Sequence, residues 1–236
     1  MDVGVVQTTS KKSKTVKEMI SETKMFSFNN PTYVAEYGGY DKYYNGTLAS
    51  WIYLPKSVAG ACSMAYCDMY ASPWLAPAGT TRGHISYTAG QLKKLTDDEI
   101  GQLYDNNCNT SRECGAFGEI LWGQETALKK VSALNRINVR RCTNYIEKQL
   151  ENALVPYLFQ QNTPNTRSSA KNVIDSFLNR VKASEGILSF STSVTQDAED
   201  AHIMNVNIHV VPAEAIEFID VKISIDRNNG VTVSES

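Results

Sequence analysis

The most constraining feature of the sequence is a strongly periodic segment that begins within the basic residues NRINVRR (135–141). Apolar residues recur after Arg141 in steps that keep them on one face of an amphipathic helix. They are Cys142, Tyr145, Ile146, Leu150, Ala153, Leu154 and Tyr157. Pro156 cannot donate an amide hydrogen bond inside a helix, so it is expected to kink or end this one. The chain around this helix must therefore bury its apolar face.

The residues downstream predict the layer that covers this helix. Residues 165–169 (NTRSS) provide caps for a second helix, which Gly186 ends. Its buried stripe is Val173, Ile174, Phe177, Leu178 and Val181. Three strands follow, at 187–195, 203–211 and 219–226, and the last two alternate apolar and polar residues. This pattern predicts two helices packed on a small sheet of three or more strands.

The first half of the chain mixes helical and strand signals. Helices are expected at 16–25 and at 97–104, where Thr96 and Glu99 form a capping box. Strands are expected at 51–54 and 117–122, and Trp74 anchors an irregular loop at 72–85. The predicted class is α+β. Its parts are an N-terminal segment (1–30), a mixed α/β part (31–115) and a two-layer C-terminal domain (116–236) with an extended arm (228–236).

The composition excludes several classes of protein. Of 236 residues, 42% are hydrophobic, and the formal net charge is −2. This charge predicts no attraction to nucleic acid or to an anionic membrane. No apolar run approaches the length of a membrane-spanning helix, so no membrane insertion is expected. The five cysteines are an odd number without an export signal, which favours reduced thiols, and no metal site or cofactor is expected.

No catalytic motif appears in the sequence. There is no phosphate loop, dinucleotide fingerprint, zinc-protease helix or nucleophile elbow. His84 and Cys114 could meet in space, but structural roles are favoured for both. The basic residues Arg136, Arg140 and Arg141 could bind phosphate. In a chain of net negative charge, ion pairs within the chain or between subunits are the better interpretation.

A succession of motifs over residues 33–226 resembles the contractile tail sheath proteins of myovirus-type bacteriophages. The motifs are WIYLPKSVAGACSMAYCD (51–68), SPWLAPAGTTRGHI (72–85), LYDNNCN (103–109), GEILWGQETA (118–127), NRINVRRCTNYIEKQL (135–150), YLFQQNTPNTRSS (157–169) and PAEAIEFIDVKISI (212–225). The resemblance is to the C-terminal, tube-proximal part of the family. It implies a structural protein rather than an enzyme, without a cofactor.

The resemblance also implies partners and a mode of action. Members form a helical sleeve of stacked hexameric rings around the tail tube, and the sleeve contracts to drive the tube through the host envelope. Extended arms at the chain ends add strands to the sheets of neighbouring subunits. The expected partners are other copies of the chain, the tail tube protein, and baseplate and terminator proteins. The expected location is the tail of the virion, after assembly in the host cytoplasm.

Three groups of residues are candidates for contacts in such an assembly. Val231, Thr232 and Val233 follow the hinge Asn228-Asn229-Gly230 and are expected to pair with a neighbouring subunit. Arg136, Arg140 and Arg141 are expected to make intersubunit or interdomain ion pairs that fix the position of the tube-proximal domain. Arg167, Lys171 and Arg180 could face an acidic tube, or could simply form a solvated helix face.

The sequence leaves several alternatives open. Family members are usually longer, so this chain is either a short sheath protein or part of a longer one. The sheath of a tail-derived bacteriocin or of a contractile secretion system would have the same features. A tail adaptor or terminator that does not polymerise, and a Cys-dependent enzyme, are further alternatives.

Overall fold

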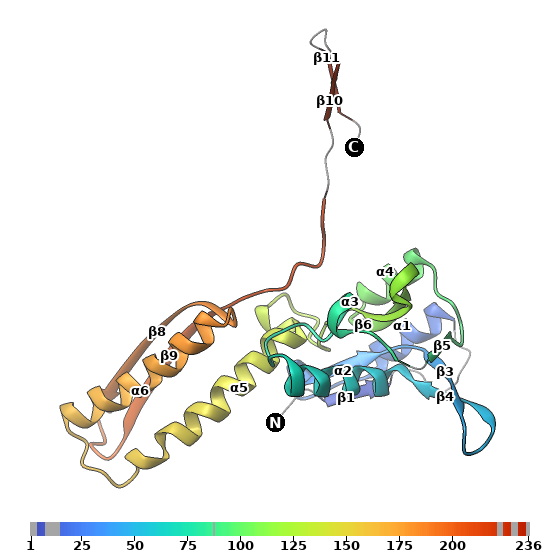
Figure 1. Cartoon of the computed structure of the whole chain (residues 1–236). Coiled ribbons are helices and arrows are strands. Elements are labelled where there is room, and N and C mark those ends of the chain that lie inside the picture. Colours follow the sequence, from blue (N-terminus) through green and yellow to red (C-terminus); the bar gives the residue numbers. More distant parts are fainter. Residues whose placement is uncertain (1–3, 8–14, 87, 221–223, 228–230, 235–236) are drawn as a thin grey trace.

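The computed structural model describes residues 4–7, 15–86, 88–220, 224–227 and 231–234. Figure 1 shows three parts: an N-terminal lobe, an elongated C-terminal lobe, and an arm that leaves the molecule near the junction of the two lobes. We use these names for residues 4–136, 137–212 and 213–234, respectively. The fold is α+β, as predicted.

The N-terminal lobe contains two small sheets with short helices around them. Its helices are α1 (Val16–Met25), α2 (Lys56–Tyr70), α3 (Gly79–Arg82) and α4 (Asp97–Tyr104), with one-turn 3-10 helices η1 (Pro31–Tyr33), η2 (Gly115–Phe117) and η3 (Ala133–Asn135). One sheet has the order β1-β2-β6-β7, formed by Gly4–Gln7, Val34–Tyr37, Cys108–Glu113 and Glu119–Trp122. The other has the order β4-β3-β5, formed by Ser50–Pro55, Tyr40–Asn45 and Thr88–Gln91.

Helices α1 and α4 begin at capping boxes. The Thr15 side chain accepts from the Glu18 amide, and Thr96 accepts from the Glu99 amide, while each glutamate reaches back to the cap backbone. These contacts satisfy backbone groups that the first helical turn leaves free. The two helices share an apolar cluster that contains Val16, Met19, Leu95, Ile100, Leu103 and Cys108. The helix predicted at 97–104 is present with those bounds.

Helix α2 packs its small-residue face closely against β2. A Cβ atom on Gly60 would lie 2.5 Å from the ring of Tyr37, which is fully buried. Glycine therefore allows a distance between the helix and the sheet that any larger residue would prevent. This helix was not predicted from the sequence.

Helix α5 (Ile137–Leu154) joins the two lobes. Its first residue, Ile137, is buried in the core of the N-terminal lobe, whereas Cys142, Ile146 and Leu150 belong to the core of the C-terminal lobe. The helix begins four residues before Arg141. It ends as predicted near Pro156, in the 3-10 helix η4 (Val155–Tyr157).

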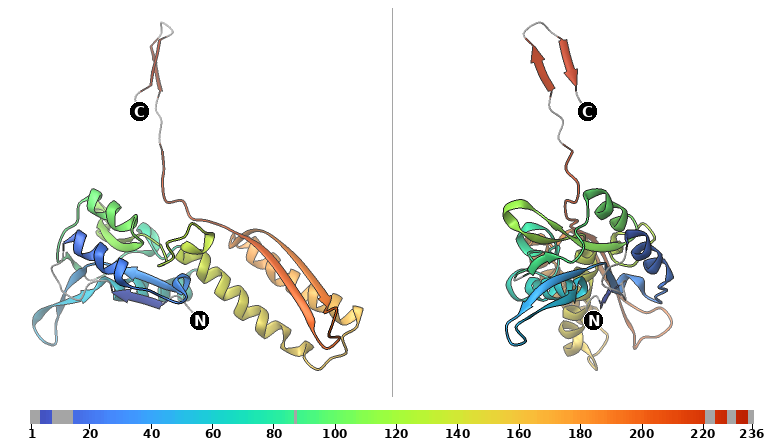
Figure 2. Two further views of the ribbon diagram at one scale, coloured as in Figure 1. Left: turned by 180° about the vertical axis from the view of Figure 1, so that it is seen from behind. Right: turned by 90° about the vertical axis from the view of Figure 1, so that its right-hand side faces the viewer.

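Helix α6 (Pro164–Ala183) runs beside α5 and covers one face of a hairpin. Its buried residues are Ala170, Ile174, Phe177, Leu178 and Val181. Strands β8 (Ile187–Gln196) and β9 (Met204–Pro212) form the hairpin. Their inward residues Phe190, Val194, Val206, Ile208 and Val210 pack on the core of the two helices. Figure 2 shows this arrangement from two further sides.

The sheet of the C-terminal lobe differs from the prediction in its number of strands. In the described part of the chain it has two strands, β8 and β9, rather than three or more. The expected third strand lies in the arm, where β10 (Ser224–Arg227) pairs antiparallel with β11 (Val231–Ser234). Residues 213–220 are extended without strand pairing and separate β10 from β9. Alternation in sequence predicts a strand but does not show which sheet it joins.

Trp74 attaches the loop 72–85 to the C-terminal lobe. Its ring lies edge-on to Tyr145 of α5 with centroids 5.6 Å apart, and its Nε1 donates to the Ser184 carbonyl at 3.0 Å. A Cβ on Gly186 would be 2.9 Å from the indole, so Gly186 leaves room for this ring. The predicted anchor of the loop therefore also fixes the orientation of the second lobe.

Candidate assembly surfaces

The β8–β9 hairpin is a sheet with two open edges. Within the described residues, each of its strands pairs with the other and with no third strand. A pair of strands is marginal by itself, and here α5 and α6 stabilise it from one face. The unpaired amide and carbonyl groups along the edges form a template for an added strand.

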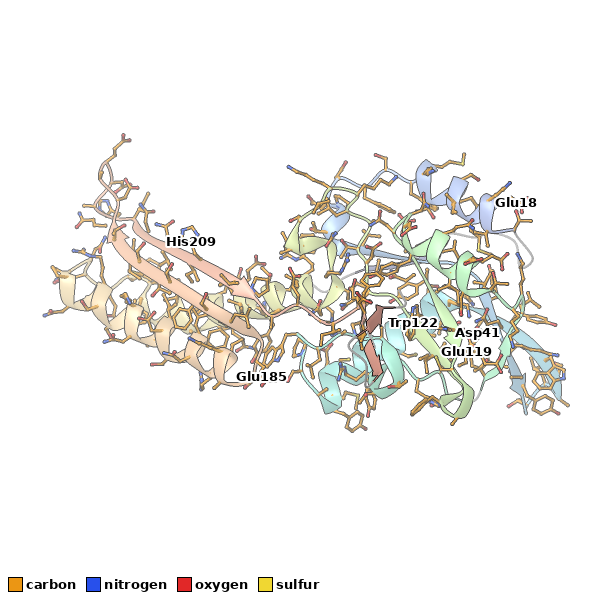
Figure 3. All side chains as sticks on the ribbon, turned by 90° about the horizontal axis from the view of Figure 1, so that it is seen from above. Glu18, Asp41, Glu119, Trp122, Glu185 and His209 are labelled. Carbon is orange, nitrogen blue, oxygen red and sulfur yellow. The ribbon has the colours of Figure 1, made fainter. Side chains whose placement is uncertain are left out.

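The outer face of this hairpin is polar. Ser191 pairs with His209 and Ser193 with Asn207, and these side chains are exposed, whereas their neighbours along each strand turn inward. Figure 3 shows His209 on the side of the hairpin away from the helices. Because this face is polar, a partner strand is more suited to an edge of the sheet than to its face.

The arm carries strands that lie away from the rest of the chain. Figures 1 and 2 show the β10–β11 hairpin separated from both lobes. In this single chain, Val231 pairs with Arg227, Thr232 with Asp226 and Val233 with Ile225. The three residues predicted to form an intersubunit strand therefore form a strand. Their pairing with a neighbouring subunit stays a prediction.

Arg136 lies where the arm leaves the body. Its Nη1 donates to Glu125 Oε1 at 2.7 Å and its Nε to Glu217 Oε1 at 2.7 Å. The Tyr104 hydroxyl donates to Glu217 Oε2 at 2.7 Å, and Gln124 Nε2 donates to Glu217 Oε1 at 3.0 Å. Burial raises the pKa of Glu125 to about 7, although the Arg136 guanidinium opposes the shift. Arg136 thus joins the arm to the N-terminal lobe.

Arg140 is buried in the second turn of α5. Its Nε donates to Asn144 at 2.7 Å and its Nη2 to Glu147 at 3.2 Å, both on the same helix. Its guanidinium lies over the Tyr33 ring, 4.2 Å from the centroid. A stacked and hydrogen-bonded arginine of this kind holds the helix against the N-terminal lobe.

Arg141 is also buried, with its side chain 1% exposed. Its Nη2 donates to the Met64 carbonyl at 3.1 Å and to Asp68 Oδ1 at 2.5 Å, both on α2. These bonds connect the predicted part 31–115 to the predicted domain 116–236. The described contacts of all three arginines lie within one chain, and a contact with another subunit remains a prediction.

The predicted tube-facing residues lie along α6. Arg167 donates to Asn162 Oδ1 at 2.8 Å and to Gln196 Oε1 at 3.2 Å. Lys171 forms an ion pair with Asp175, and the exposed Arg180 lies over the ring of Phe177. Arg167 and Lys171 are partly occupied by local contacts, so Arg180 is the most available cation of the three. Their contact with a tube remains a prediction.

A buried ionic cluster in the N-terminal lobe was not predicted. Lys56 Nζ contacts the Asp41 carboxylate and the Ser111 hydroxyl, and lies 3.4 Å from Glu119 Oε1. All three charged side chains are at most 4% exposed. Figure 3 shows Asp41 and Glu119 side by side. The three charges come from β3, α2 and β7, so neither spacing nor motif marks them in the sequence.

A groove of about 870 Å³ lies between the lobes at the root of the arm. The N-terminal lobe, the C-terminal lobe and the arm all line it, with Trp74, Tyr104, Trp122, Leu188, Ile216 and Phe218 among the residues. Figure 3 labels Trp122 and Glu185, which line it from the two lobes. Its lining is mainly apolar.

The described residues contain no group of His, Cys, Asp and Glu that could hold a metal ion. They also contain no helix long and apolar enough to cross a membrane. His84 Nδ1 lies 3.3 Å from Ser86 Oγ, and no hydrogen bond between His84 and Cys114 is present in the described part of the chain. The features that stand out are therefore strand edges, an arm and ion pairs that join elements.

Comparison with known proteins shows which protein family the C-terminal part of the chain is similar to. Residues 129–226 match the family profile of the phage tail sheath C-terminal domain. This part of the chain is a phage tail sheath C-terminal domain. The match covers α5, α6, the β8–β9 hairpin and the first part of the arm. The predicted resemblance to contractile tail sheath proteins is confirmed.

Curated tail sheath proteins are similar over a wider range. The tail sheath protein of Vibrio phage KVP40 is 33% identical over 185 residues, which are 76% of this chain and 27% of that protein. That of Enterobacteria phage T4 is 30% identical over 185 residues, 76% of this chain and 28% of that protein. The chain thus spans about a quarter of the length of these relatives.

Solved sheath structures share the fold. The sheath complex of the extracellular contractile injection system PVC, in its contracted state, gives a TM-score of 0.78 with 19% identity. The alignment covers 94% of this chain and 63% of that one. The contracted helical sheath of the anti-feeding prophage gives a TM-score of 0.74 with 20% identity, over 94% of this chain and 61% of that one. The fold of sheath subunits therefore extends over nearly the whole chain.

Proposed function

We propose that this chain acts as a structural subunit of a contractile sheath. Copies of it would polymerise as stacked hexameric rings around a tail tube, and contraction of the sheath would drive the tube through the host envelope for genome delivery. It would act as part of the virion tail, after assembly in the host cytoplasm. The proposal gives the chain mechanical work and no catalysis.

One observation carries this proposal: in the described residues, a two-stranded sheet without a further strand partner is combined with two strands held away from the body. A hairpin on an extended arm cannot be stabilised by its own lobe, and the open sheet can accept strands. If the arm of one copy reaches the sheet of the next, each contact is heterologous and leaves a free arm and a free sheet at the two ends. Contacts of this kind build rings and helical tubes.

Strand exchange also suits a sheath that contracts. Main-chain hydrogen bonds hold an added strand to a neighbouring sheet, and they can stay formed while the connection between the arm and its own body changes angle. The bodies could then rotate between two lattice packings while the strands stay paired, and the energy released would be the free-energy difference between the packings. The other proposed partners are the tail tube, baseplate and terminator proteins.

A second candidate is the sheath of a contractile injection system, such as a tail-derived bacteriocin or a secretion system. The similarity of fold to the PVC and anti-feeding prophage sheaths favours it, while the similarity in sequence to phage tail sheath proteins favours a phage tail.

We also propose that the chain divides into residues 1–30, 31–115 and 116–236. Strand β7 pairs with β6 across residue 115, so these parts share a sheet.

Electron microscopy of the purified chain tests the proposal. Rings or tubes are expected at high protein concentration, with or without an added tail tube. A cryo-EM map of such tubes should show a strand of one copy beside β8 or β9 of another. Particles that stay monomeric at every concentration and with tubes present would count against a sheath and in favour of a non-polymerising adaptor.

A further inference from the structure

The root of the arm is attached to the body at two places. At the first, the Ala213 amide donates to the Gly186 carbonyl at 3.3 Å, and Asn138 Nδ2 donates to the Ala213 carbonyl at 3.4 Å. At the second, four residues further on, the attachment is made by the side chain of Glu217. Residues 213–220 form no strand pairing in the described chain.

Glu217 is held by three donors from three separate segments. Tyr104 is the last residue of α4, Gln124 follows β7, and Arg136 immediately precedes α5. Their hydrogen bonds to the carboxylate are 2.7, 3.0 and 2.7 Å long. The Glu217 side chain is 16% exposed, whereas its neighbours Ile216 and Phe218 are 84% and 80% exposed. The arm therefore meets the body at this point through a single carboxylate.

Contacts within the N-terminal lobe keep the donors of the Glu217 site in place. Arg136 has a second partner in Glu125, at 2.7 Å, which keeps its guanidinium in place. The guanidinium also lies 5.9 Å from the centre of the Tyr104 ring. Glu125 and Arg136 are 12% and 22% exposed, so the carboxylate of Glu217 enters a partly desolvated site. Hydrogen bonds between ionised groups are stronger than neutral ones in such a site.

We propose that Glu217 is a positioning residue that clamps the root of the arm to the body, so that the arm bends only beyond residue 217. The proposal rests on the proposed function and deepens it. In a sheath, residues 213–217 would move with the body, and a bend at residues 218–220 would absorb the change in angle between neighbouring copies. Because side chains alternate along an extended backbone, the clamp also turns Ile216 and Phe218 outward.

The clamp can be tested on the isolated chain by pulsed electron paramagnetic resonance. Spin labels are placed at Gln102→Cys on α4 and at Ile216→Cys, which is exposed and lies between the two attachments of the arm, in a background with Cys62→Ser and Cys114→Ser. The parent is expected to give one narrow distribution of distances. Glu217→Ala should give a broad one, because the arm then pivots at Ala213. A distribution that stays narrow in Glu217→Ala would overturn the proposal.

Two further variants make the test specific. Glu214→Ala removes the same charge from the same arm, but Glu214 is exposed and has no ion pair in the described part of the chain, so the distribution should stay narrow. Tyr104→Phe removes one donor and leaves the arm unchanged, so it should broaden the distribution partially. Equal broadening in Glu214→Ala and Glu217→Ala would also overturn the proposal. Circular dichroism melting shows whether each variant is folded.

Electron microscopy of the same variants without labels separates the two proposals. If the parent forms tubes and Glu217→Ala forms fewer or irregular ones, both proposals are supported. If Glu217→Ala broadens the distance distribution but not even the parent forms tubes, the clamp stands and the sheath function fails. If the parent forms tubes and Glu217→Ala changes neither the distances nor the tubes, the function stands and the clamp fails.

Discussion

At the residue scale, Lys56 has the greatest expected effect on stability. Its ammonium group compensates two carboxylates, Asp41 and Glu119, in a site with almost no solvent exposure. Burial raises the pKa of Asp41, and Lys56 opposes that shift. Removal of one member of such a group leaves an uncompensated buried charge, which costs more than the intact cluster contributes.

We therefore expect Lys56→Met to lower the free energy of unfolding by about 3–5 kcal/mol. Chemical denaturation followed by circular dichroism measures this change. Lys148→Met is the matched control, because Lys148 lies on the exposed face of α5, and it should change the free energy of unfolding by less than about 0.5 kcal/mol. Similar effects of the two substitutions would contradict the role assigned to the buried cluster.

The raised pKa of the buried Glu36 should make the stability of the chain depend on pH. It is 1% exposed, and its Oε2 has no hydrogen-bond partner in the described part of the chain. Burial raises its pKa from 4.5 to about 7, against the opposing effects of Lys129 and Thr23. Between these values the folded state holds a proton that the unfolded state has lost. Stability therefore falls as the pH rises through this window, by up to about 3 kcal/mol for this group.

Glu36→Gln should reduce that fall and raise the free energy of unfolding at pH 8. Glu125 has a pKa shifted in the same direction, so the slope between pH 4.5 and 7 should be reduced rather than abolished. Denaturant titrations at several pH values measure the slope. Glu199→Gln, in an exposed loop, should leave it unchanged. A slope unaltered by Glu36→Gln would show that Glu36 titrates normally in the folded chain.

At the scale of elements, the glycines of two helices should respond in opposite ways to alanine. Gly60→Ala places a Cβ 2.5 Å from the Tyr37 ring, so α2 must move from β2, at a cost of about 1–3 kcal/mol. A Cβ on Gly101 of α4 has no heavy atom within 4 Å. Gly101→Ala should therefore stabilise the chain by about 0.5–1 kcal/mol through helix propensity. Thermal melting compares them, and a stabilising Gly60→Ala would contradict the close packing of α2.

Local signals in the sequence predicted most of the elements. The capping box of Thr96 and Glu99 fixed the start of α4, and Pro156 marked the end of α5. The small residues of α2 have neither strong amphipathicity nor a cap, so that helix was not predicted. The third strand was assigned to the wrong sheet because alternation indicates a strand and not its partner.

The contacts between distant segments could not be predicted. Tyr104 and Glu217 are 113 positions apart, and Lys56 and Glu119 are 63 apart. Charged residues are common, and nothing in their local sequence shows which of them will meet in the fold. Arg136, Arg140 and Arg141 each form an ion pair within the chain, and their partners became known only from the structure. A role of these arginines between subunits stays a prediction.

At the scale of the whole molecule, folding and assembly are expected to depend on different parts of the chain. The buried residues of the three apolar clusters in the described chain all lie between Val16 and Ile187, within the two lobes. Deletion of residues 228–236 should therefore leave the melting temperature nearly unchanged while it removes β11, the predicted intersubunit strand. The truncated chain is expected to remain folded and to lose assembly.

The most direct test of the central claim compares the native chain and this truncation by electron microscopy at equal concentration. The sheath account predicts rings or tubes from the native chain and dispersed particles from the truncation, with the same circular dichroism spectrum for both. Normal tubes from the truncated chain would contradict the proposal that the end of the arm joins neighbouring subunits.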